Sequence, residues 1–227
     1  MSEFKLIFED LGLSEYKKTW DYQEEVHNEL IASHAKDKFL PHRLIFVEHP
    51  HVYTLGQSGT QNNLLINDDF LKKINASYYR TNRGGDITYH GPGQIVGYPI
   101  FNLFSLGMGV RDYIFKLEES IIECLKDFGI ESERLEGATG VWLDVGKPGF
   151  TRKICAIGVR VGHGVTMHGF AFNVNTNLSY FNYINPCGFV DKGVTSLEKE
   201  LGCTQDFNMV KIKLLQKMKE VFQFEIV

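Results

Sequence analysis

Two residues of this sequence, Cys187 and Lys153, have the chemistry of a nucleophile and of the cation that would activate it. Cys187 stands between Pro186, which fixes the backbone before it, and Gly188, which leaves the backbone after it free to turn. A cysteine in a turn can be both accessible and oriented, as a nucleophile must be. An ammonium group beside such a thiol lowers the thiol pKa and can also carry a proton. The pair therefore indicates covalent catalysis by a thiolate.

Each of these two residues also has an ordinary structural interpretation. Most free cysteines are buried as small apolar side chains, and a lysine at the start of a strand is usually solvated. Cys155 lies inside an apolar run and Cys124 in a helical pattern, so both are interpreted as core residues, whereas Cys203 has no evident role. The sequence contains no C-x-x-C pair, which argues against a zinc ribbon and a thioredoxin-type motif. Four cysteines in a large domain without an export signal favour free thiols in a reducing compartment.

The most unusual stretch of the chain is residues 83–94, with the sequence RGGDITYHGPGQ. Gly84 and Gly85 allow positive φ angles and a close approach of a ligand to the backbone, and the GPG triplet predicts a stiff turn. The pattern is neither G-x-x-x-x-G-K-[ST] nor G-x-G-x-x-G, so no nucleotide site is predicted. A surface hairpin is the ordinary interpretation. A loop that faces a ligand is the alternative, because arginine, threonine, tyrosine and histidine rarely gather on a mere connector.

Residues 168–174, HGFAFNV, are a further candidate segment for the wall of a site, beside the cysteine–lysine pair and the glycine-rich segment. Gly169 would let an acyl chain or a pantetheine arm pass close to the strand. Two bulky phenylalanines alternate with the small Ala171, so the two faces of the strand are expected to differ in bulk. His168 fits a structural role as well as a catalytic one.

His49 and His51, in the run EHPH, could be read as ligands of a metal ion. No cluster of Asp, Glu or Cys with suitable spacing accompanies them. The sequence therefore predicts no metal site, and no other cofactor is expected.

These segments must be positioned by a fold in which strands outnumber helices. Apolar side chains at three- and four-residue spacing predict helices over residues 15–36 and 110–128 and a last helix capped by Asp206, with Val210, Leu214, Met218 and Val221 on its apolar face. Thr195 and Glu198 have the spacing of a capping box and predict the start of a short helix. Strands are predicted at residues 4–8, 44–47, 52–55, 78–81, 94–103, 140–145, 153–161 and 166–174. Because the strands cluster and do not alternate strictly with helices, the expected class is α+β, a mixed α/β sheet with packed helices.

The bulk composition limits the possible partners. With 227 residues and 43% apolar side chains, the chain can form a large core, and one catalytic domain over residues 1–227 is expected. A net charge of −4 predicts no strong attraction for nucleic acid or an anionic membrane. Residues 1–10 are too charged for a secretory signal, and no run approaches the apolar length of a membrane span. A cytoplasmic protein is therefore expected.

Together these segments resemble the lipoyl(octanoyl) transferase family. They occur in the order and approximate spacing of that family, and the resemblance extends over most of the chain, residues 44–188. Each motif alone has modest specificity for the family, whereas the combination of all of them is highly specific. The pieces are residues 47–50 (VEHP), 53–56 (YTLG), 83–94, 153–158, 168–174 and 185–188.

The resemblance implies a fold shared with biotin and lipoate protein ligases. It also implies transfer of an octanoyl group from octanoyl-acyl-carrier protein to a protein lysine, the first step of making lipoyl groups in place. The implied acceptors are lipoyl domains of 2-oxoacid dehydrogenase acyltransferase subunits and the glycine cleavage H protein. Cys187 matches the acyl-thioester nucleophile, and Lys153 matches the lysine that lowers its pKa. The positions that match substrate-binding segments are Arg83, Gly84, Gly85, Asp86, Ile87, Thr88, Tyr89, His90, Ala156, Ile157, Gly158, Gly169, Phe170 and Ala171.

Three other functions stay open on the sequence. An ATP-dependent lipoate ligase on the same scaffold would need an adenylate site and no essential cysteine. A non-catalytic acyl- or carrier-binding module would never form a covalent intermediate, and a cysteine hydrolase would accept water in place of lysine. A thioester is already activated, so its transfer to a thiol is nearly isoenergetic and its transfer to an amine is downhill. A transferase therefore needs no ATP, which fits the missing nucleotide motif.

Overall fold

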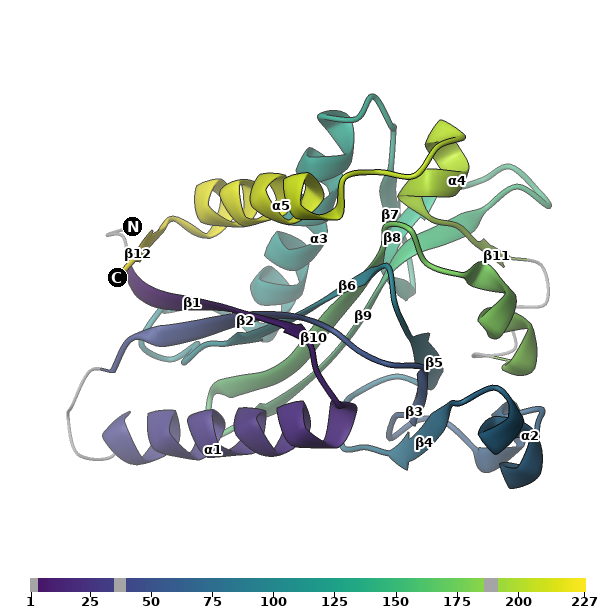
Figure 1. Ribbon diagram of the computed structural model, residues 1–227. Helices are drawn as coiled ribbons and strands as arrows, with labels where there is room; N and C mark the ends of the chain where they lie inside the picture. Colours follow the sequence, from purple (N-terminus) through teal and green to yellow (C-terminus); the bar gives the residue numbers. More distant parts are fainter. Residues whose placement is uncertain (1–3, 35–39, 186–191) are drawn as a thin grey trace.

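The computed structural model describes residues 4–34, 40–185 and 192–227, and its main element is a large mixed sheet (Figure 1). Within these residues the strand order is β12-β1-β2-β6-β10-β9-β8-β7, with β11 beside β9. Strand β1 runs parallel to β2 and β12, and β11 runs parallel to β9, while the other neighbours are antiparallel. The α+β class expected from the sequence is therefore confirmed. The strands are β1 Phe4–Leu13, β2 His42–Glu48, β6 Gln94–Ile100, β7 Glu133–Leu135, β8 Ala138–Leu143, β9 Arg152–Gly162, β10 Val165–Asn173, β11 Gly193–Val194 and β12 Phe224–Ile226.

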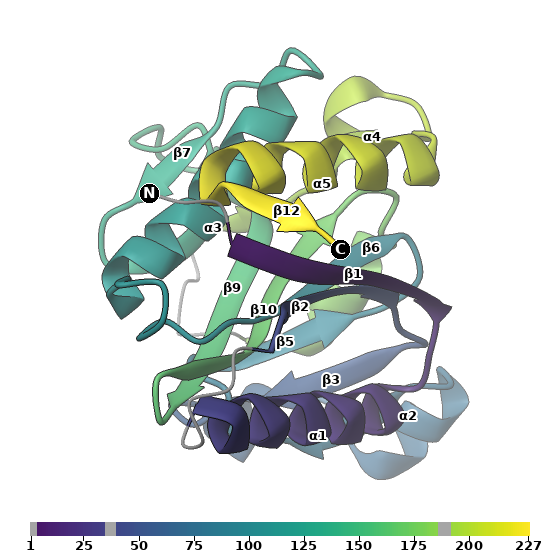
Figure 2. The ribbon, with the colours of Figure 1, turned by 90° about the vertical axis from the view of Figure 1, so that its left-hand side faces the viewer.

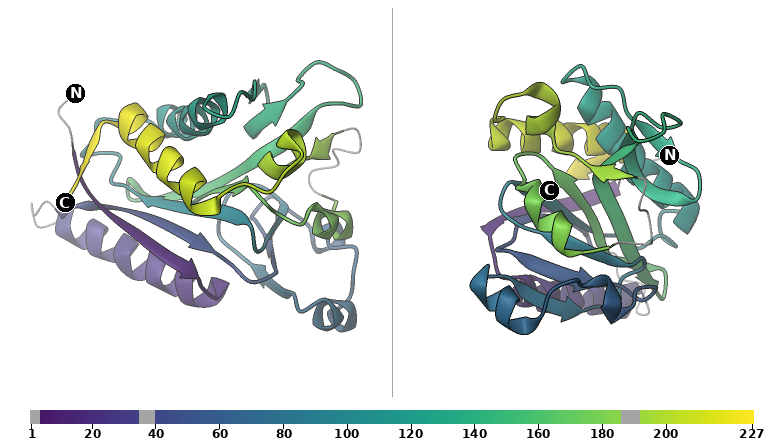
Figure 3. Two further views of the ribbon diagram at one scale, coloured as in Figure 1. Left: turned by 45° about the horizontal axis from the view of Figure 1, so that its top comes forward. Right: turned by 90° about the vertical axis from the view of Figure 1, so that its right-hand side faces the viewer.

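A second sheet of three strands lies at one end of the described structure (Figure 3). It has the order β4-β3-β5, and β5 and β6 therefore belong to different sheets. Residues 91–93 carry the chain from one sheet to the other, so the interpretation of this stretch as a surface hairpin is wrong. Gly93 has φ +79°, and its carbonyl oxygen accepts from the amide of Asn175 at 2.8 Å. The strands are β3 Val52–Leu55, β4 Ser77–Arg80 and β5 Ile87–His90.

Three long helices cover the large sheet on both faces (Figures 1 and 2). Helix α1 (Tyr16–His34) packs on one face, and α3 (Val110–Lys126) and α5 (Phe207–Phe222) pack on the other. The buried side chains of α5 recur every four residues, as the sequence pattern predicts, but the last of them is Phe222 and not Val221. The helices that support the site were thus visible in the spacing of apolar residues.

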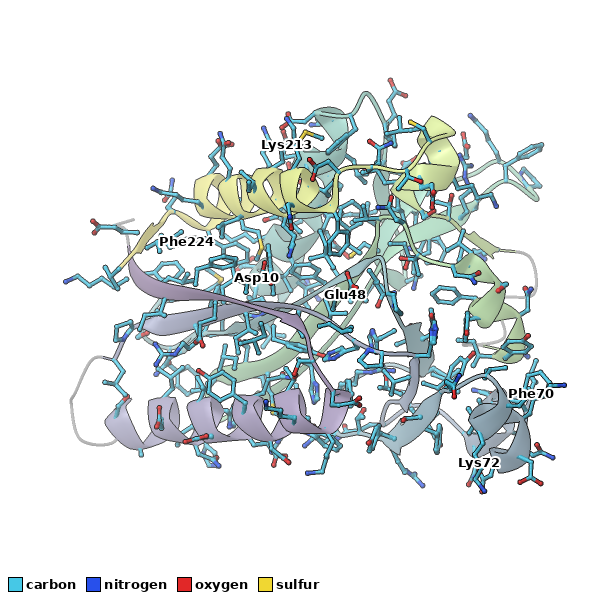
Figure 4. The ribbon with its side chains drawn as sticks, in the orientation of Figure 1. Asp10, Glu48, Phe70, Lys72, Lys213 and Phe224 are labelled. Carbon is cyan, nitrogen blue, oxygen red and sulfur yellow. The ribbon has the colours of Figure 1, made fainter. Side chains whose placement is uncertain are left out.

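Strand β10 is buried along its whole length, and its side chains contribute to the cores on both faces of the large sheet. Phe170 and Phe172 belong to the core under α3 and α5, which also contains Phe224 at the start of β12 (Figure 4). Ala171 belongs to the smaller core under α1. The predicted difference in bulk between the two faces of this strand is confirmed.

Two short helices and the caps complete the scaffold. Asp206 caps α5 as predicted, since its Oδ1 accepts from the amides of Asn208 and Met209 at 3.0 and 3.1 Å. Helix α4 (Leu197–Leu201) is capped by Ser196, whose Oγ accepts from Lys199, and not by Thr195. Thr195 is fully buried, and its hydroxyl donates to Glu200. Helix α2 (Asp68–Lys73) packs Phe70 edge-on against Tyr183 of the 3₁₀ helix η2 (Leu178–Tyr183) (Figure 4).

Candidate active site

A cavity of about 720 Å³ lies where the glycine-rich segment meets β9 and β10. Its walls come from segments far apart in the sequence, around residues 83–90, 153–159 and 168–173, together with residues 137–142. Strands β9 and β10 pair antiparallel, with Gly158 opposite Gly169 and Ala156 opposite Ala171. This register places two of the predicted segments in one wall of the cavity.

The structure brings together nearly all of the residues that were expected to bind substrate. They lie around one cavity, as does Lys153, although the strands that carry them are not neighbours in the sequence. The residues concerned are Arg83, Gly84, Gly85, Asp86, Ile87, Thr88, His90, Ala156, Ile157, Gly158, Gly169, Phe170 and Ala171.

Tyr89 is the exception, because it does not line the cavity. Its side chain is fully buried in a third core, beside the three-stranded sheet, where the ring stacks on Tyr180 and the hydroxyl lies 2.7 Å from Nδ1 of His51. Side chains alternate along a strand, so its neighbours Thr88 and His90 face the cavity while Tyr89 faces away. Tyr89 therefore holds the small sheet against η2.

A chain of buried hydrogen bonds ties the cavity wall across both sheets. Arg83, only 7% exposed, donates through its guanidinium to the carbonyl oxygen of Thr54 at 2.6 Å and to Thr54 Oγ1 at 3.0 and 3.2 Å. Thr54 Oγ1 lies 3.3 Å from His90 Nε2, and His90 Nδ1 lies 2.9 Å from Gln94 Oε1. Gln94 Nε2 in turn donates to Asn173 Oδ1 at 2.8 Å. Both sheets are thus fixed to each other at the site.

The same series of hydrogen bonds determines which nitrogen of His90 is protonated. The Gln94 amide donates through Nε2, so its Oε1 must accept, and His90 carries its proton on Nδ1. Thr54 then donates its hydroxyl hydrogen to His90 Nε2. Burial holds the pKa of His90 well below its usual value, and the neighbouring His49 and Arg83 lower it further. His90 is therefore a neutral link in the wall and not a ready proton donor.

The contact between the first segment and β9 leaves little room for side chains, since a Cβ on Gly84 would lie 3.1 Å from the carbonyl oxygen of Val159. The amide of Gly84 donates to the carbonyl oxygen of Val159 at 2.8 Å. A Cβ placed on Gly158 would lie 2.9 Å from the carbonyl oxygen of Gly84 and 3.3 Å from a guanidinium nitrogen of Arg83. Only the missing side chains let the two backbones approach this closely.

Gly169 lines the cavity and is also packed closely against β6. A Cβ at this position would lie 2.1 Å from the carbonyl oxygen of Gly97 and 2.7 Å from Cδ of Pro99, both in β6. The expected passage of an acyl chain close to this strand stays a prediction. The glycine is needed for strand packing.

His168 also lines the cavity, and its backbone is unusual. It has φ +60° within a buried strand, a conformation that costs energy for a residue with a Cβ. Its Nε2 lies 2.7 Å from Oδ1 of Asn82 and so donates to it. Burial lowers the pKa of His168 to about 3, and the charges of Arg83 and Arg160 act in the same direction. It is therefore neutral, which favours its structural interpretation.

Lys153 extends from β9 into a corner of the cavity built by the β7–β8 hairpin. The side chain is half-buried, and its Nζ donates to the carbonyl oxygen of Thr139 at 3.3 Å. The same Nζ lies 4.4 Å from the centre of the Trp142 ring. The ordinary expectation of a freely solvated lysine is thus not met.

Cys187 lies outside the described residues, so its position relative to Lys153 stays a prediction. The residues that flank segment 186–191, Asn185 and Lys192, both line the cavity. Asn185 is fixed there, since its amide donates to the carbonyl oxygen of Asn63 at 2.9 Å. Cys124 and Cys155 are buried, as expected of core residues, and Cys203 is exposed.

Several lining residues were not expected to belong to the site. Tyr16 lies in the helix predicted over residues 15–36, and its buried side chain lines the cavity. Tyr98 donates to His49 Nε2 at 2.8 Å, and His49 Nδ1 donates to the carbonyl oxygen of Ser14, so both ring nitrogens of His49 have protein partners. Trp142 belongs to no motif. Across the part of the chain that the structure describes, no group of three or more His, Cys, Asp or Glu could hold a metal ion.

Comparisons with known sequences identify the class of protein to which this fold and this cavity belong. The family described as "Lipoyl protein ligase A/B catalytic domain" matches residues 15–219. The octanoyltransferase of Flavobacterium johnsoniae is 52% identical over 230 residues, covering 98% of this chain and 99% of that protein. The octanoyltransferase of Bacteroides fragilis is 52% identical over 210 residues, covering 92% and 95%. The chain therefore belongs to the lipoyl protein ligase A/B catalytic family and, within it, to the octanoyltransferases, which are acyltransferases.

Solved structures agree on the fold. A bipartite lipoate protein ligase from Thermoplasma acidophilum superposes with a TM-score of 0.66 at 15% identity, covering 100% of this chain and 86% of that one. The biotin protein ligase of Aquifex aeolicus gives a TM-score of 0.51 at 13% identity, covering 96% and 69%. At such low identity the likeness shows the fold alone, and it confirms the expected relation to the biotin and lipoate ligases.

Proposed function

We propose that this chain transfers an octanoyl group from octanoyl-acyl-carrier protein to a specific lysine of a lipoyl domain through a thioester on Cys187. The observation that carries the proposal is the single cavity that gathers Lys153 and the glycine-rich, β9 and β10 segments, with Asn185 and Lys192 at its wall. Only segment 186–191 separates these last two residues, and Cys187 belongs to it. The residues that precede and follow the segment with the expected nucleophile therefore both belong to the cavity wall.

In the first half-reaction Cys187 acts as a thiolate, after its proton has passed to Lys153. The sulfur attacks the thioester carbonyl, and the bond between this carbon and the carrier sulfur breaks. The ammonium group of Lys153 then returns the proton to the departing thiolate of the carrier. The products are an octanoyl-enzyme and a free carrier thiol, so atoms and charge balance without another reactant.

In the second half-reaction the acceptor lysine must lose a proton before it can attack. Lys153, now neutral, takes this proton and makes the amine nucleophilic. The amine attacks the octanoyl thioester, the bond to Cys187 breaks, and an amide forms. The second proton of the attacking nitrogen passes to the Cys187 sulfur, and Lys153 releases the proton it took to solvent. Because the carrier has already left, the scheme predicts ping-pong kinetics.

The acyl chain requires an apolar surface, and the cavity offers one. Val96, Ile114, Ile157, Val159 and Phe170 all line it. Burying apolar carbon contributes about 0.8 kcal/mol for each CH₂ group, so these side chains can bind a medium-length chain strongly. The contact of the acyl chain is thus proposed along these side chains.

The partners and the location follow from this chemistry. We propose lipoyl domains of 2-oxoacid dehydrogenase acyltransferase subunits and the glycine cleavage H protein as acceptors, with residues 1–227 acting as one cytoplasmic catalytic unit without a cofactor. Among the residues described, no helix is both long and apolar enough to cross a bilayer. An ATP-dependent ligase activity shares the fold, but a transferase needs no nucleotide, because the donor thioester is already activated.

The test is steady-state transfer by matched cysteine variants. We expect Cys187→Ala to abolish transfer from octanoyl-carrier protein and Cys203→Ala, at an exposed cysteine, to leave it unchanged. Lys153→Ala should raise the pH at which Cys187 reacts with iodoacetamide, because the neighbouring ammonium group is lost. Normal turnover by Cys187→Ala would refute the proposal. Pyrophosphate release from ATP with free lipoate would instead support a ligase.

A further inference from the structure

The ammonium group of Lys153 is held by an aromatic ring that no sequence motif indicates. Its Nζ lies 4.4 Å from the centre of the Trp142 ring. Contacts of lysines with other rings in the described parts of the chain are longer, for example 5.3 Å for Lys211 over Phe207. A cation within about 6 Å of a ring face is attracted by the ring quadrupole, most strongly for tryptophan and in a poorly hydrated place.

The ring itself cannot move easily. Trp142 is 2% exposed, and its indole Nε1 donates to the carbonyl oxygen of Ala138 at 2.9 Å. Both residues lie in β8 at the wall of the cavity. The indole is therefore a fixed surface under the lysine, because both its packing and its hydrogen bond determine its plane.

The stem of Lys153 runs beside Gly140 of β8. Gly140 has φ +124°, and a Cβ there would lie 3.5 Å from Cδ and Cε of Lys153. The amide of Gly140 donates to Oε1 of Glu118 at 3.0 Å, and Glu118 is in turn paired with Arg134. A carboxylate on α3 thus fixes the strand that supports the lysine.

We propose that Trp142 is a positioning residue for Lys153. The indole ring of Trp142 holds the ammonium group of Lys153 at the cavity wall and favours the protonated form of this lysine. The inference rests on the proposed function in one respect, namely that Lys153 serves Cys187. A half-buried ammonium group loses water, and the ring replaces part of that hydration. The thiolate of Cys187 would then have a cation whose position does not depend on the substrate.

Other ionisable groups near Lys153 can also affect its protonation, and none of them is changed when Trp142 is replaced. They come from α3, from β9 and from the other walls of the cavity. They are Glu118, Cys155, Arg83, Asp86, Lys192 and, outside the described residues, Cys187.

The test measures the titration of the Lys153 amine by NMR in the full-length enzyme with ¹³C-labelled lysine, where Lys153→Arg identifies the signal. Trp142→Phe keeps a ring, and Trp142→Leu removes the ring and leaves an apolar side chain that is closer in size to phenylalanine. We expect the titration midpoint of Lys153 to be lower by about one pH unit in the leucine variant than in the phenylalanine variant. Equal midpoints would overturn the inference.

A second measurement keeps the test decisive if the leucine variant does not fold. The sequence has two tryptophans, so Trp20→Phe leaves Trp142 as the single site for fluorinated tryptophan. Fluorine atoms weaken the ring quadrupole with little change of shape. The midpoint of Lys153 should fall stepwise with the number of fluorines, and a constant midpoint would contradict the proposal.

The pH profile for iodoacetamide alkylation of Cys187 separates this inference from the proposed function. If Trp142 positions Lys153 for the thiol, Trp142→Leu shifts the profile to higher pH, and Trp142→Phe shifts it less. If the titration midpoint of Lys153 falls in Trp142→Leu while the alkylation profile of Cys187 stays unchanged, the contact between Trp142 and Lys153 is supported. The same result refutes the proposal that Lys153 activates Cys187.

Discussion

Four buried histidines should make this protein sensitive to mild acid. Burial lowers the pKa of His42 and His49 to about 4 and that of His168 to about 3, from 6.5 in the unfolded chain. Burial also lowers the pKa of His90 well below its ordinary value. Between these folded and unfolded values the unfolded chain binds more protons, so the free energy of unfolding rises with pH in this window and falls on acidification.

The size of the effect follows from linkage. For one histidine with a folded pKa of about 4, lowering the pH from about 7 to about 5.5 removes about 1.2 kcal/mol of stability. His42, His49 and His168 together would remove about 3 to 4 kcal/mol, and His90 would add to this. The carboxylates with lowered pKa values, such as Asp144 and Glu200, titrate below this window and act in the same direction at lower pH.

The assay is urea unfolding at a series of pH values between about 5.5 and 7, followed by circular dichroism. His42→Asn is a suitable variant, because Asn can keep the acceptor that His42 Nδ1 offers to the amide of Asn102 at 3.1 Å. We expect this variant to lose about 1.2 kcal/mol less on acidification than the parent. A free energy of unfolding that is flat over this range, or a slope unchanged by His42→Asn, would refute the reasoning.

Three substitutions test how the site is built. Gly169→Ala places a Cβ against a carbonyl oxygen of β6 and should destabilise the fold by about 2 to 3 kcal/mol in urea, whereas Gly193→Ala meets only ordinary contacts and should change it by less than about 0.5 kcal/mol. Tyr89→Phe should lower stability by about 1 kcal/mol and leave kcat unchanged, because Tyr89 faces away from the cavity; a large fall in kcat would contradict this placement. Arg83→Lys loses the forked contact with β3 and should lower both activity and Tm, by about 4 to 8 °C for a loss of about 2 kcal/mol; an unchanged Tm would contradict the structural role of that contact.

The walls of the site could be predicted from the sequence because their signals are local. Glycine pairs mark close backbone approach, and residues 156–158 and 169–171 lie in strongly patterned strands. Once these strands are neighbours, their antiparallel register brings the two segments opposite each other. The long helices were visible for the same reason, since α5 buries a side chain at each turn.

Other features depend on contacts that no local pattern encodes. The residues of the turn at 91–93 would be suitable both for closing a hairpin and for joining two sheets. The pairing of the flanking strands with distant strands determines that this turn joins two sheets. Gly169 is required by close contacts with Gly97 and Pro99 of β6, which are distant from it in the sequence. Trp142 lies under Lys153 only because β8 and β9 pair, and very short elements such as β11 have too few residues to show a period.

The central claim is that one sulfur carries the octanoyl group between two proteins. The most direct measurement is intact-protein mass spectrometry after the enzyme is mixed with octanoyl-carrier protein alone and then separated from it. The account predicts a mass increase of one octanoyl group, located on Cys187 and released by neutral hydroxylamine, that a lipoyl domain then removes onto its own lysine. A Cys187→Ala enzyme that forms the same adduct, or an octanoyl-enzyme that cannot pass its acyl group to the lipoyl domain, would contradict the account.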